Sequence, residues 1–211
     1  MTEITSDQLR GMIAAISTTI AASSDELNRL DSALGDGDHG MSLSTAFADA
    51  VAKIAVLEHL TPSDVLRLAG QSLMNRMGGA SGALYGTLFT RSSAKVDGKN
   101  ILTHMDVKEL WQAALDGVIQ RGKAQAGDKT MIDALQPAVL AFDQGTTMSE
   151  SFEMAAVAAA DGAQKTSAMV AKHGRAKFAG ERSLGHIDAG ARSVALMFAA
   201  MNSYWKDNQH G

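Results

Sequence analysis

The stretch LDSALGDGDHGMS, residues 30–42, carries three carboxylates among glycines and lies between two helical sequence patterns. On its N-terminal side, apolar residues recur at helical spacing over residues 5–34. On its C-terminal side, a second helix is predicted after Gly40, with Leu43 and Phe47 facing inward. The stretch is therefore predicted to form a tight acidic loop that joins two helices.

The same helical periodicity continues along the rest of the chain. Thr61-Pro62 is a typical N-cap and first-turn pair for a third helix, and Gly78-Gly79 ends that helix before a fourth begins near Ser81. No segment alternates as a half-buried strand does, so the class is predicted to be all-α, with eight helices and mostly antiparallel neighbours. The last four helices are expected over residues 106–121, 130–143, 149–173 and 189–206.

The amino-acid composition and net charge of the chain exclude several classes of protein. The 211 residues include no Cys, carry a net charge of −4 and are 45% hydrophobic, which suits a single globular domain spanning residues 1–211. This charge gives no basic surface for nucleic acid. No apolar run reaches the ~20 residues that span a bilayer, and the first residues lack a signal-peptide pattern. We expect a cytoplasmic protein that binds neither nucleic acid nor membranes.

Three common glycine-rich motifs do not explain the acidic loop. Residues 35–40 match G-x-G-x-x-G, but a helix precedes them and the two carboxylates inside the turn would repel a pyrophosphate. An EF-hand would need Gly at Met41 and Glu at Phe47. In a P-loop, Lys would follow Gly127, where the chain has Asp128.

The remaining interpretation is a metal site that binds a polyphosphate. Mg²⁺ prefers hard oxygen ligands, and Asp31, Asp36 and Asp38 are close enough in sequence to hold one or two ions. Ser42 lies at the start of the next helix, where amide N–H groups and the helix dipole favour an anion. Residues 78–83, GGASGA, have a similar layout and predict a second anion-binding helix start.

The later polar segments have two interpretations each. Arg175 and Arg182 can neutralise phosphates, but surface arginines are also common without a ligand. Asp128 and Asp133 can be simple helix caps, and His39 can be a hydrogen-bonded structural histidine. Residue spacing alone therefore indicates a magnesium-polyphosphate binder with a kinase-like site.

Four segments, in order, resemble the L subunit of dihydroxyacetone kinase, which is the nucleotide-binding component of that enzyme. They are LDSALGDGDHG, MGGASGALYGTLF, GVIQRGKAQAGDKTMIDAL and GRAKFAGERSLGHIDAGARS. The resemblance covers nearly the full chain. It implies an eight-helix antiparallel up-and-down α-barrel, with ADP or ATP bound at one rim by the loops between helices.

The resemblance also implies roles for individual residues. Asp31, Asp36 and Asp38 would hold two Mg²⁺ ions, and Arg175 is the candidate catalytic residue. The nucleotide phosphates would lie along His39, Gly40, Met41, Ser42, Ala80 and Ser81, and the adenosine side would be lined by Gly122, Met131, Arg175, Asp188, Ala189 and Gly190. The chain departs from the family pattern at Ser42, where some relatives have Asn, and at Ala189, where many have Pro.

By the same resemblance, the chain would be one half of a kinase. A separate K-type subunit would hold dihydroxyacetone, and the phosphoryl donor would be either free ATP or an M-type subunit of the phosphotransferase system that rephosphorylates bound ADP. Two alternatives stay open. The partner's acceptor could be a tetrulose or an acyl group, or the chain could be a nucleotide-dependent binding protein that signals to a transcriptional regulator.

Overall fold

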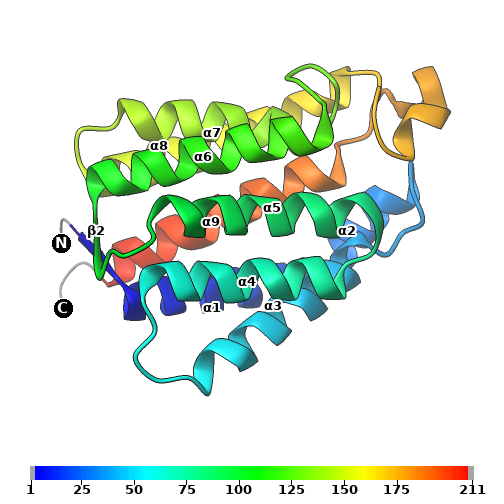
Figure 1. The fold of residues 1–211 in the computed structure, drawn as a ribbon. Coiled ribbons are helices and arrows are strands. Elements are labelled where there is room, and N and C mark those ends of the chain that lie inside the picture. Colours follow the sequence, from blue (N-terminus) through cyan, green and yellow to red (C-terminus); the bar gives the residue numbers. More distant parts are fainter. Residues whose placement is uncertain (1–2, 209–211) are drawn as a thin grey trace.

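The computed structural model describes residues 3–208, and nearly all of its regular structure is helical (Figure 1). The helices are joined by short connections, with a longer irregular segment before the last one (Figure 1). The elements in chain order are β1 (Glu3–Thr5), α1 (Ser6–Ala22), α2 (Ser24–Ser32), α3 (His39–Ala55), α4 (Pro62–Arg76), α5 (Gly79–Lys95), β2 (Ile101–Thr103), α6 (His104–Gly122), α7 (Ile132–Gln144), α8 (Met148–Lys165), η1 (Thr166–Ala168), η2 (Ala176–Ser183) and α9 (Ala189–Asp207).

The helices pack side by side as a closed ring. From α3 to α9, each helix contacts the next one along the chain, α1 contacts α3, and α9 returns to contact α1. From α3 onward, consecutive helices run in opposite directions (Figure 1). This arrangement confirms the predicted all-α class and the eight-helix barrel, with α1 and α2 together as its first member. Within residues 3–208, no helix is both long enough and apolar enough to cross a membrane.

Aromatic rings fill one part of the barrel interior. Trp111 from α6 lies against Phe198 from α9, with their ring centroids 4.7 Å apart. The Phe152 ring on α8 lies 5.2 Å from Phe142 on α7 and 5.6 Å from Trp205 on α9. These rings come from four helices, so burying them ties the later half of the ring together.

Small residues let α7 and α8 approach closely. Ala155, Ala159 and Ala163 recur every fourth residue on α8 and are all buried. A Cβ atom on Gly162 would lie only 2.2 Å from the carbonyl oxygen of Asp133, which is far too close for non-bonded atoms. The position therefore requires glycine.

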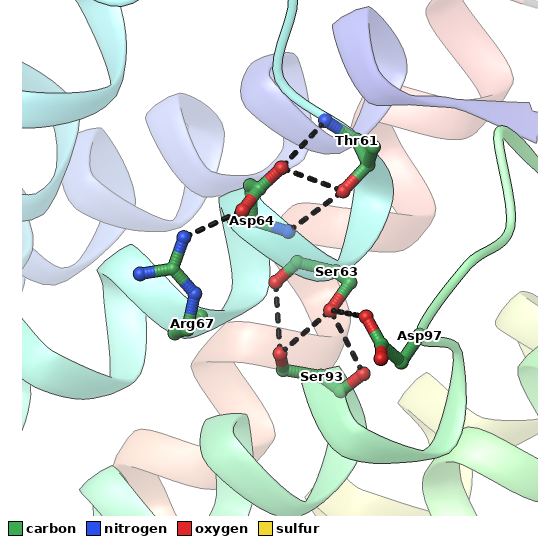
Figure 2. Close-up of polar contacts among 6 residues, drawn as sticks. All are labelled: Thr61, Ser63, Asp64, Arg67, Ser93 and Asp97. Atoms are coloured by element: carbon green, nitrogen blue, oxygen red, sulfur yellow. Dashed lines mark hydrogen bonds and ion pairs between the residues drawn. The ribbon is translucent and has the colours of Figure 1, made fainter.

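The predicted N-cap at Thr61 is confirmed, and it helps to join two helices (Figure 2). The Asp64 carboxylate accepts hydrogen bonds from the Thr61 amide at 3.1 Å and from its hydroxyl at 2.7 Å, while the Asp64 amide donates back to the Thr61 hydroxyl. One residue after Pro62, the Ser63 carbonyl accepts a hydrogen bond of 2.9 Å from the Ser93 hydroxyl near the end of α5. The start of α4 is thereby attached to the end of α5.

The single helix predicted over residues 5–34 is wrong, because the structure breaks it at Ser23. This residue ends α1 and is also the N-cap of α2, with ψ near 7°. Its amide still donates to the carbonyls of Thr19 and Ile20. Consecutive serines compete locally for backbone hydrogen bonds, so the helix can change direction here. As a result, α2 is a separate short helix that carries Asp31 at its end.

The helix predicted over residues 149–173 is too long. In the structure α8 ends at Lys165, and a short 3-10 turn, η1, follows it. The Thr166 hydroxyl donates to the Ala163 carbonyl at 2.6 Å, and the Ser167 hydroxyl donates to the Gln164 carbonyl at 2.8 Å. Hydrogen bonds from side chains to nearby carbonyls compete with the backbone hydrogen bonds of the helix, and they favour its termination.

Two smaller expectations also need correction. The chain was predicted to have no strands, yet β1 and β2 form a short antiparallel ladder in which Ile4 pairs with Leu102. Each strand has only three residues, so neither is long enough to show alternation in the sequence. In addition, α5 begins at Gly79, two residues before the predicted start near Ser81.

Candidate metal and phosphate site

A cavity of about 710 Å³ lies at one end of the barrel, and most of the predicted site residues line it. In Figure 1 this is the right-hand end, where the loop after α2 approaches the segment before α9. The lining residues that were predicted from the sequence are Asp31, Asp36, Asp38, His39, Ser42, Ala80, Ser81, Gly122, Met131, Arg175, Asp188, Ala189 and Gly190. Gly40 and Met41 do not line the cavity.

Three carboxylates, from Asp31, Asp36 and Asp38, converge at the cavity wall. Each offers one oxygen, and the three oxygens lie within 4.8 Å of one another. The Asp31 carboxylate also accepts hydrogen bonds from the amides of Gly37 at 2.8 Å and Asp38 at 3.2 Å, which folds the loop back onto α2. Three hard oxygen donors with no nitrogen or sulfur ligand form a donor set that fits Mg²⁺.

Glycine makes this close convergence possible. Gly37 has a φ of +79°, a left-handed conformation that costs glycine little. At Gly35, a Cβ atom would lie 2.3 Å from an oxygen of the Asp31 carboxylate. A side chain at either position would therefore strain the loop or displace a carboxylate.

Arg175 reaches the acidic cluster from a distant part of the sequence. Its guanidinium forms an ion pair with the Asp36 carboxylate across the cavity mouth. The hydrogen bond from Arg175 lowers the pKa of the Asp36 carboxyl below its usual range, so this group is charged at neutral pH. Arg175 thus compensates part of the negative charge of the cluster.

The start of α5 forms a second wall of the cavity. Residues 79–81 line it, and the N-cap residue Gly78 has no side chain with which to bond the first amides of the helix. The first N–H groups of any helix lack partners within the helix, and they carry its positive dipole end. This geometry suits a phosphate group, as the sequence predicted for Ala80 and Ser81.

The amides of Gly40 and Met41 already have a protein partner. Both donate to the side-chain oxygen of Asn28, at 2.8 Å and 3.1 Å. Asn28 lies one helical turn before Asp31 on α2, so both side chains lie on the same face of that helix. Sequence reasoning missed Asn28, although its spacing of three residues from Asp31 was a usable signal.

His39 faces the interior of the protein. Its side chain is only 8% exposed, and its Nε2 atom lies 3.0 Å from the Ser193 hydroxyl of α9. The Tyr85 hydroxyl of α5 lies 2.5 Å from the same Ser193 oxygen. Burial lowers the pKa of the His39 imidazole, although the nearby aspartates oppose this effect. This network attaches the start of α3 to α5 and α9. Neither Tyr85 nor Ser193 was identified from the sequence.

Asp188 closes the cavity at the start of α9. Its carboxylate caps the helix by accepting a hydrogen bond of 2.8 Å from the Ala191 amide. Burial raises the pKa of the Asp188 carboxyl to about 6. Ala189 occupies the first helical position of α9, where proline is well tolerated.

The fold and the site together define a class: a helical barrel whose rim brings three carboxylates and the uncapped start of a helix into one cavity. Residues 33–203 match the family model described as the DAK2 domain. The chain therefore belongs to the DAK2 domain family.

Individual relatives indicate a narrower class of protein than the family model does. The chain is 41% identical over 175 residues to the ADP-binding subunit DhaL of PEP-dependent dihydroxyacetone kinase 1 from Listeria innocua serovar 6a, covering 83% of this chain and 84% of the relative. It is 38% identical to the corresponding DhaL subunit from Escherichia coli K12, over 82% of this chain and 85% of the relative. These relatives confirm the resemblance to the L subunit of dihydroxyacetone kinase.

A solved structure has the same fold. It is the dihydroxyacetone kinase from C. freundii in complex with AMP-PNP and Mg²⁺, with a TM-score of 0.74 and 27% sequence identity. The match covers 96% of this chain and 35% of that one. This chain thus spans about a third of the length of that kinase.

Proposed function

We propose that this chain is the nucleotide-binding component of a dihydroxyacetone kinase, forming one domain over residues 1–211. It would transfer a phosphoryl group from a bound magnesium-nucleotide to dihydroxyacetone on a separate K-type subunit. The observation that carries the proposal is the carboxylate cluster, which lies opposite the uncapped start of α5 in one cavity. The names of the two bacterial relatives support ADP as the nucleotide and dihydroxyacetone as the acceptor.

Asp31, Asp36 and Asp38 would hold the metal, and we propose two Mg²⁺ ions. Bound Mg²⁺ supplies charge neutralisation for the phosphate oxygens. The chain's own groups would do the positioning: residues 79–81 and Ser42, which line the cavity, would face the phosphates, and Arg175 would add positive charge at the cavity mouth. Phosphoryl transfer depends largely on such positioning and electrostatic stabilisation.

The adenosine part of ADP or ATP would occupy the other side of the cavity. That side is lined by Gly122 at the end of α6, by Met131 just before α7, and by residues 188–190 at the start of α9. His39, Gly40 and Met41 would support the phosphate site from behind, because their polar groups bond to Ser193 and Asn28.

The names of the relatives support a choice of acceptor and donor partners. Because those relatives are subunits described as PEP-dependent, we propose that an M-type phosphotransferase subunit rephosphorylates bound ADP. The cavity rim, with its Arg175–Asp36 pair, is the part of the chain that must approach the acceptor on the K-type subunit. A transcriptional regulator is a further partner that the same ADP-loaded rim could bind.

The test is Mg²⁺-dependent binding of ADP, measured by isothermal titration calorimetry on the purified protein. We expect binding in the presence of Mg²⁺ and loss of binding when EDTA is added. Asp36→Ala should abolish both this binding and phosphoryl transfer with the partner subunits, whereas Asp116→Ala, an exposed position on α6, should leave both unchanged. ADP binding that is equally tight in EDTA, or full transfer activity in Asp36→Ala, would refute the proposal.

A further inference from the structure

The segment between α8 and α9, residues 166–188, forms one edge of the cavity, and we call it the rim segment. It contains the two short turns η1 and η2 and has an exposed tip, where Phe178 is 78% exposed. From this tip Arg175 reaches Asp36. The position of Arg175 therefore depends on how the base of the rim segment is fixed.

A buried lysine joins the two ends of the rim segment. Lys129 is 1% exposed, and its ammonium donates to the Thr166 carbonyl at 2.6 Å and also to the His186 carbonyl. Its backbone φ is +61°, a left-handed conformation that disfavours residues with a Cβ atom. A long side chain is thus kept at an unfavourable backbone position, where its ammonium bridges both ends of the segment.

The preceding residue, Asp128, holds the middle of the rim segment. Its carboxylate is almost fully buried and pairs with the Lys172 ammonium at 3.0 Å and with Nε2 of His173 at 3.2 Å. Its carbonyl accepts a hydrogen bond of 3.1 Å from the Lys172 amide. Two consecutive residues of the connection between α6 and α7 therefore contact the rim segment at its start, middle and end.

Bonds within the rim segment close its base. The Gly185 amide donates to the Ser167 carbonyl at 2.8 Å, and the Asp188 amide donates to the Thr166 hydroxyl at 2.9 Å. The base is a closed loop, and the contacts of Asp128 and Lys129 set where this loop sits on the barrel.

We propose that Asp128 and Lys129 are positioning residues that hold the rim segment over the cavity, so that Arg175 faces the acidic cluster and Asp188 faces the nucleotide. The proposal rests on the proposed function, because it takes a magnesium-nucleotide as the ligand. Lys129 lines the cavity, but its ammonium is engaged by two carbonyls, so it acts on the ligand through the rim segment.

The first measurement is amide hydrogen exchange of the full chain without nucleotide. In Lys129→Met, we expect exchange of residues 166–188 to accelerate by about tenfold or more, because a buried charged donor to two carbonyls is lost. Exchange in the helices should stay unchanged. Lys206→Met is the matched control, since it removes a surface ion pair to Glu153 at a distance from the rim segment.

The second measurement is the rate of Mg-ADP dissociation, which a merely structural role would not change in the folded protein. We expect Lys129→Met to release Mg-ADP about tenfold faster or more, and Lys129→Arg to restore most of the wild-type rate because it retains a charged donor. If Lys129→Met does not fold, Lys172→Met tests the neighbouring contact, between Asp128 and the rim segment, from the exposed side. Faster exchange around residue 172 and faster Mg-ADP release are then expected.

Two results would overturn the proposal. One is unchanged exchange of residues 166–188 in both Lys129→Met and Lys172→Met. The other is faster exchange with an unchanged rate of Mg-ADP dissociation, which would show that the nucleotide does not need the rim segment held in place. A wild-type protein that binds no Mg-ADP would instead refute the proposed function, and the exchange comparison alone would then decide whether the two residues hold the segment.

Discussion

The three aspartates of the acidic cluster have different structural roles. Asp31 accepts two backbone hydrogen bonds and thereby shapes its own loop. Asp38 is the N-cap residue of α3, yet its side chain makes no capping hydrogen bond. Asp36 forms the ion pair with Arg175. Among the three, Asp38 is therefore the residue whose charge contributes least to the fold.

This difference predicts different stability effects for two isosteric substitutions. In Asp38→Asn we expect metal-free stability to stay equal or to rise by up to about 1 kcal/mol, because repulsion within the cluster decreases. In Asp31→Asn we expect a loss of about 1–2 kcal/mol, because two hydrogen bonds to a charged acceptor weaken. Both variants should bind Mg-ADP at least tenfold more weakly. Urea unfolding in EDTA and calorimetry measure the two effects, and equal stability losses in both variants would contradict the assignment.

The raised pKa of Asp188 predicts a pH dependence of stability. The folded-state pKa of about 6 lies above the value of about 4 for an unfolded chain, so the folded protein binds more protons between these pH values. The contribution of Asp188 to stability is therefore highest below pH 4 and is lost as the pH rises through 6. Relative to wild type, the unfolding free energy of Asp188→Asn should rise by about 2 kcal/mol from pH 4 to pH 7. Urea titrations without metal measure this difference, and a flat difference would refute the pKa assignment.

At the scale of single elements, α2 is the support for the acidic loop. Asn28 on α2 bonds the amides of Gly40 and Met41 in the first turn of α3, and Asp31 on the same face bonds the loop between the two helices. A Cβ atom on Gly40 would lie 2.1 Å from the Ser24 carbonyl oxygen, so the start of α3 packs directly on the start of α2. The short helix thus aligns two consecutive parts of the site.

Asn28→Ala should weaken the attachment of the start of α3 to α2. We expect a stability loss of about 1–2 kcal/mol, as for other lost helix caps, together with weaker Mg-ADP binding. Asn28→Asp keeps an acceptor oxygen beside the helix start and should retain most of the stability. Thermal unfolding of both variants tests the prediction, and identical losses in the two would argue against a capping role.

The helices were largely predictable from local pattern, and tertiary contacts contributed to the error at the end of α8. Some features are determined by residues that are close together in sequence and can therefore be recognised from the sequence alone. They are the caps at Thr61 and Asp188 and the helix over residues 189–207. The end of α8 depends on local and distant residues. The Thr166 and Ser167 hydroxyls bond to the preceding turn, and residues after Lys165 are also held by Asp128 and Lys129 on another connection. For the same reason the acidic loop was identifiable, whereas Ser193 and Tyr85, which lie far from it in sequence, were not.

At the scale of the whole molecule, the ring closes only if neighbouring helices approach closely. Gly162→Ala places a methyl group against the Asp133 carbonyl, which cannot move without shifting α7. We expect a stability loss of about 1–3 kcal/mol from this overpacking. Val157→Ala changes an exposed position on the same helix and should cost less than about 0.5 kcal/mol. Chemical unfolding of both variants measures the contrast, and similar costs would show that the α7–α8 approach is not tight.

The closing contact between α1 and α9 places both ends of the described chain at the same end of the barrel, opposite the cavity (Figure 1). A fusion partner, a surface anchor or a fluorescent label attached to either terminus would therefore leave the cavity mouth accessible. The geometry also favours circular permutation, in which a short linker joins the old termini and a new opening is cut in the connection between α3 and α4. The barrel can thus be carried as a module of a longer polypeptide with its reactive rim still facing outward.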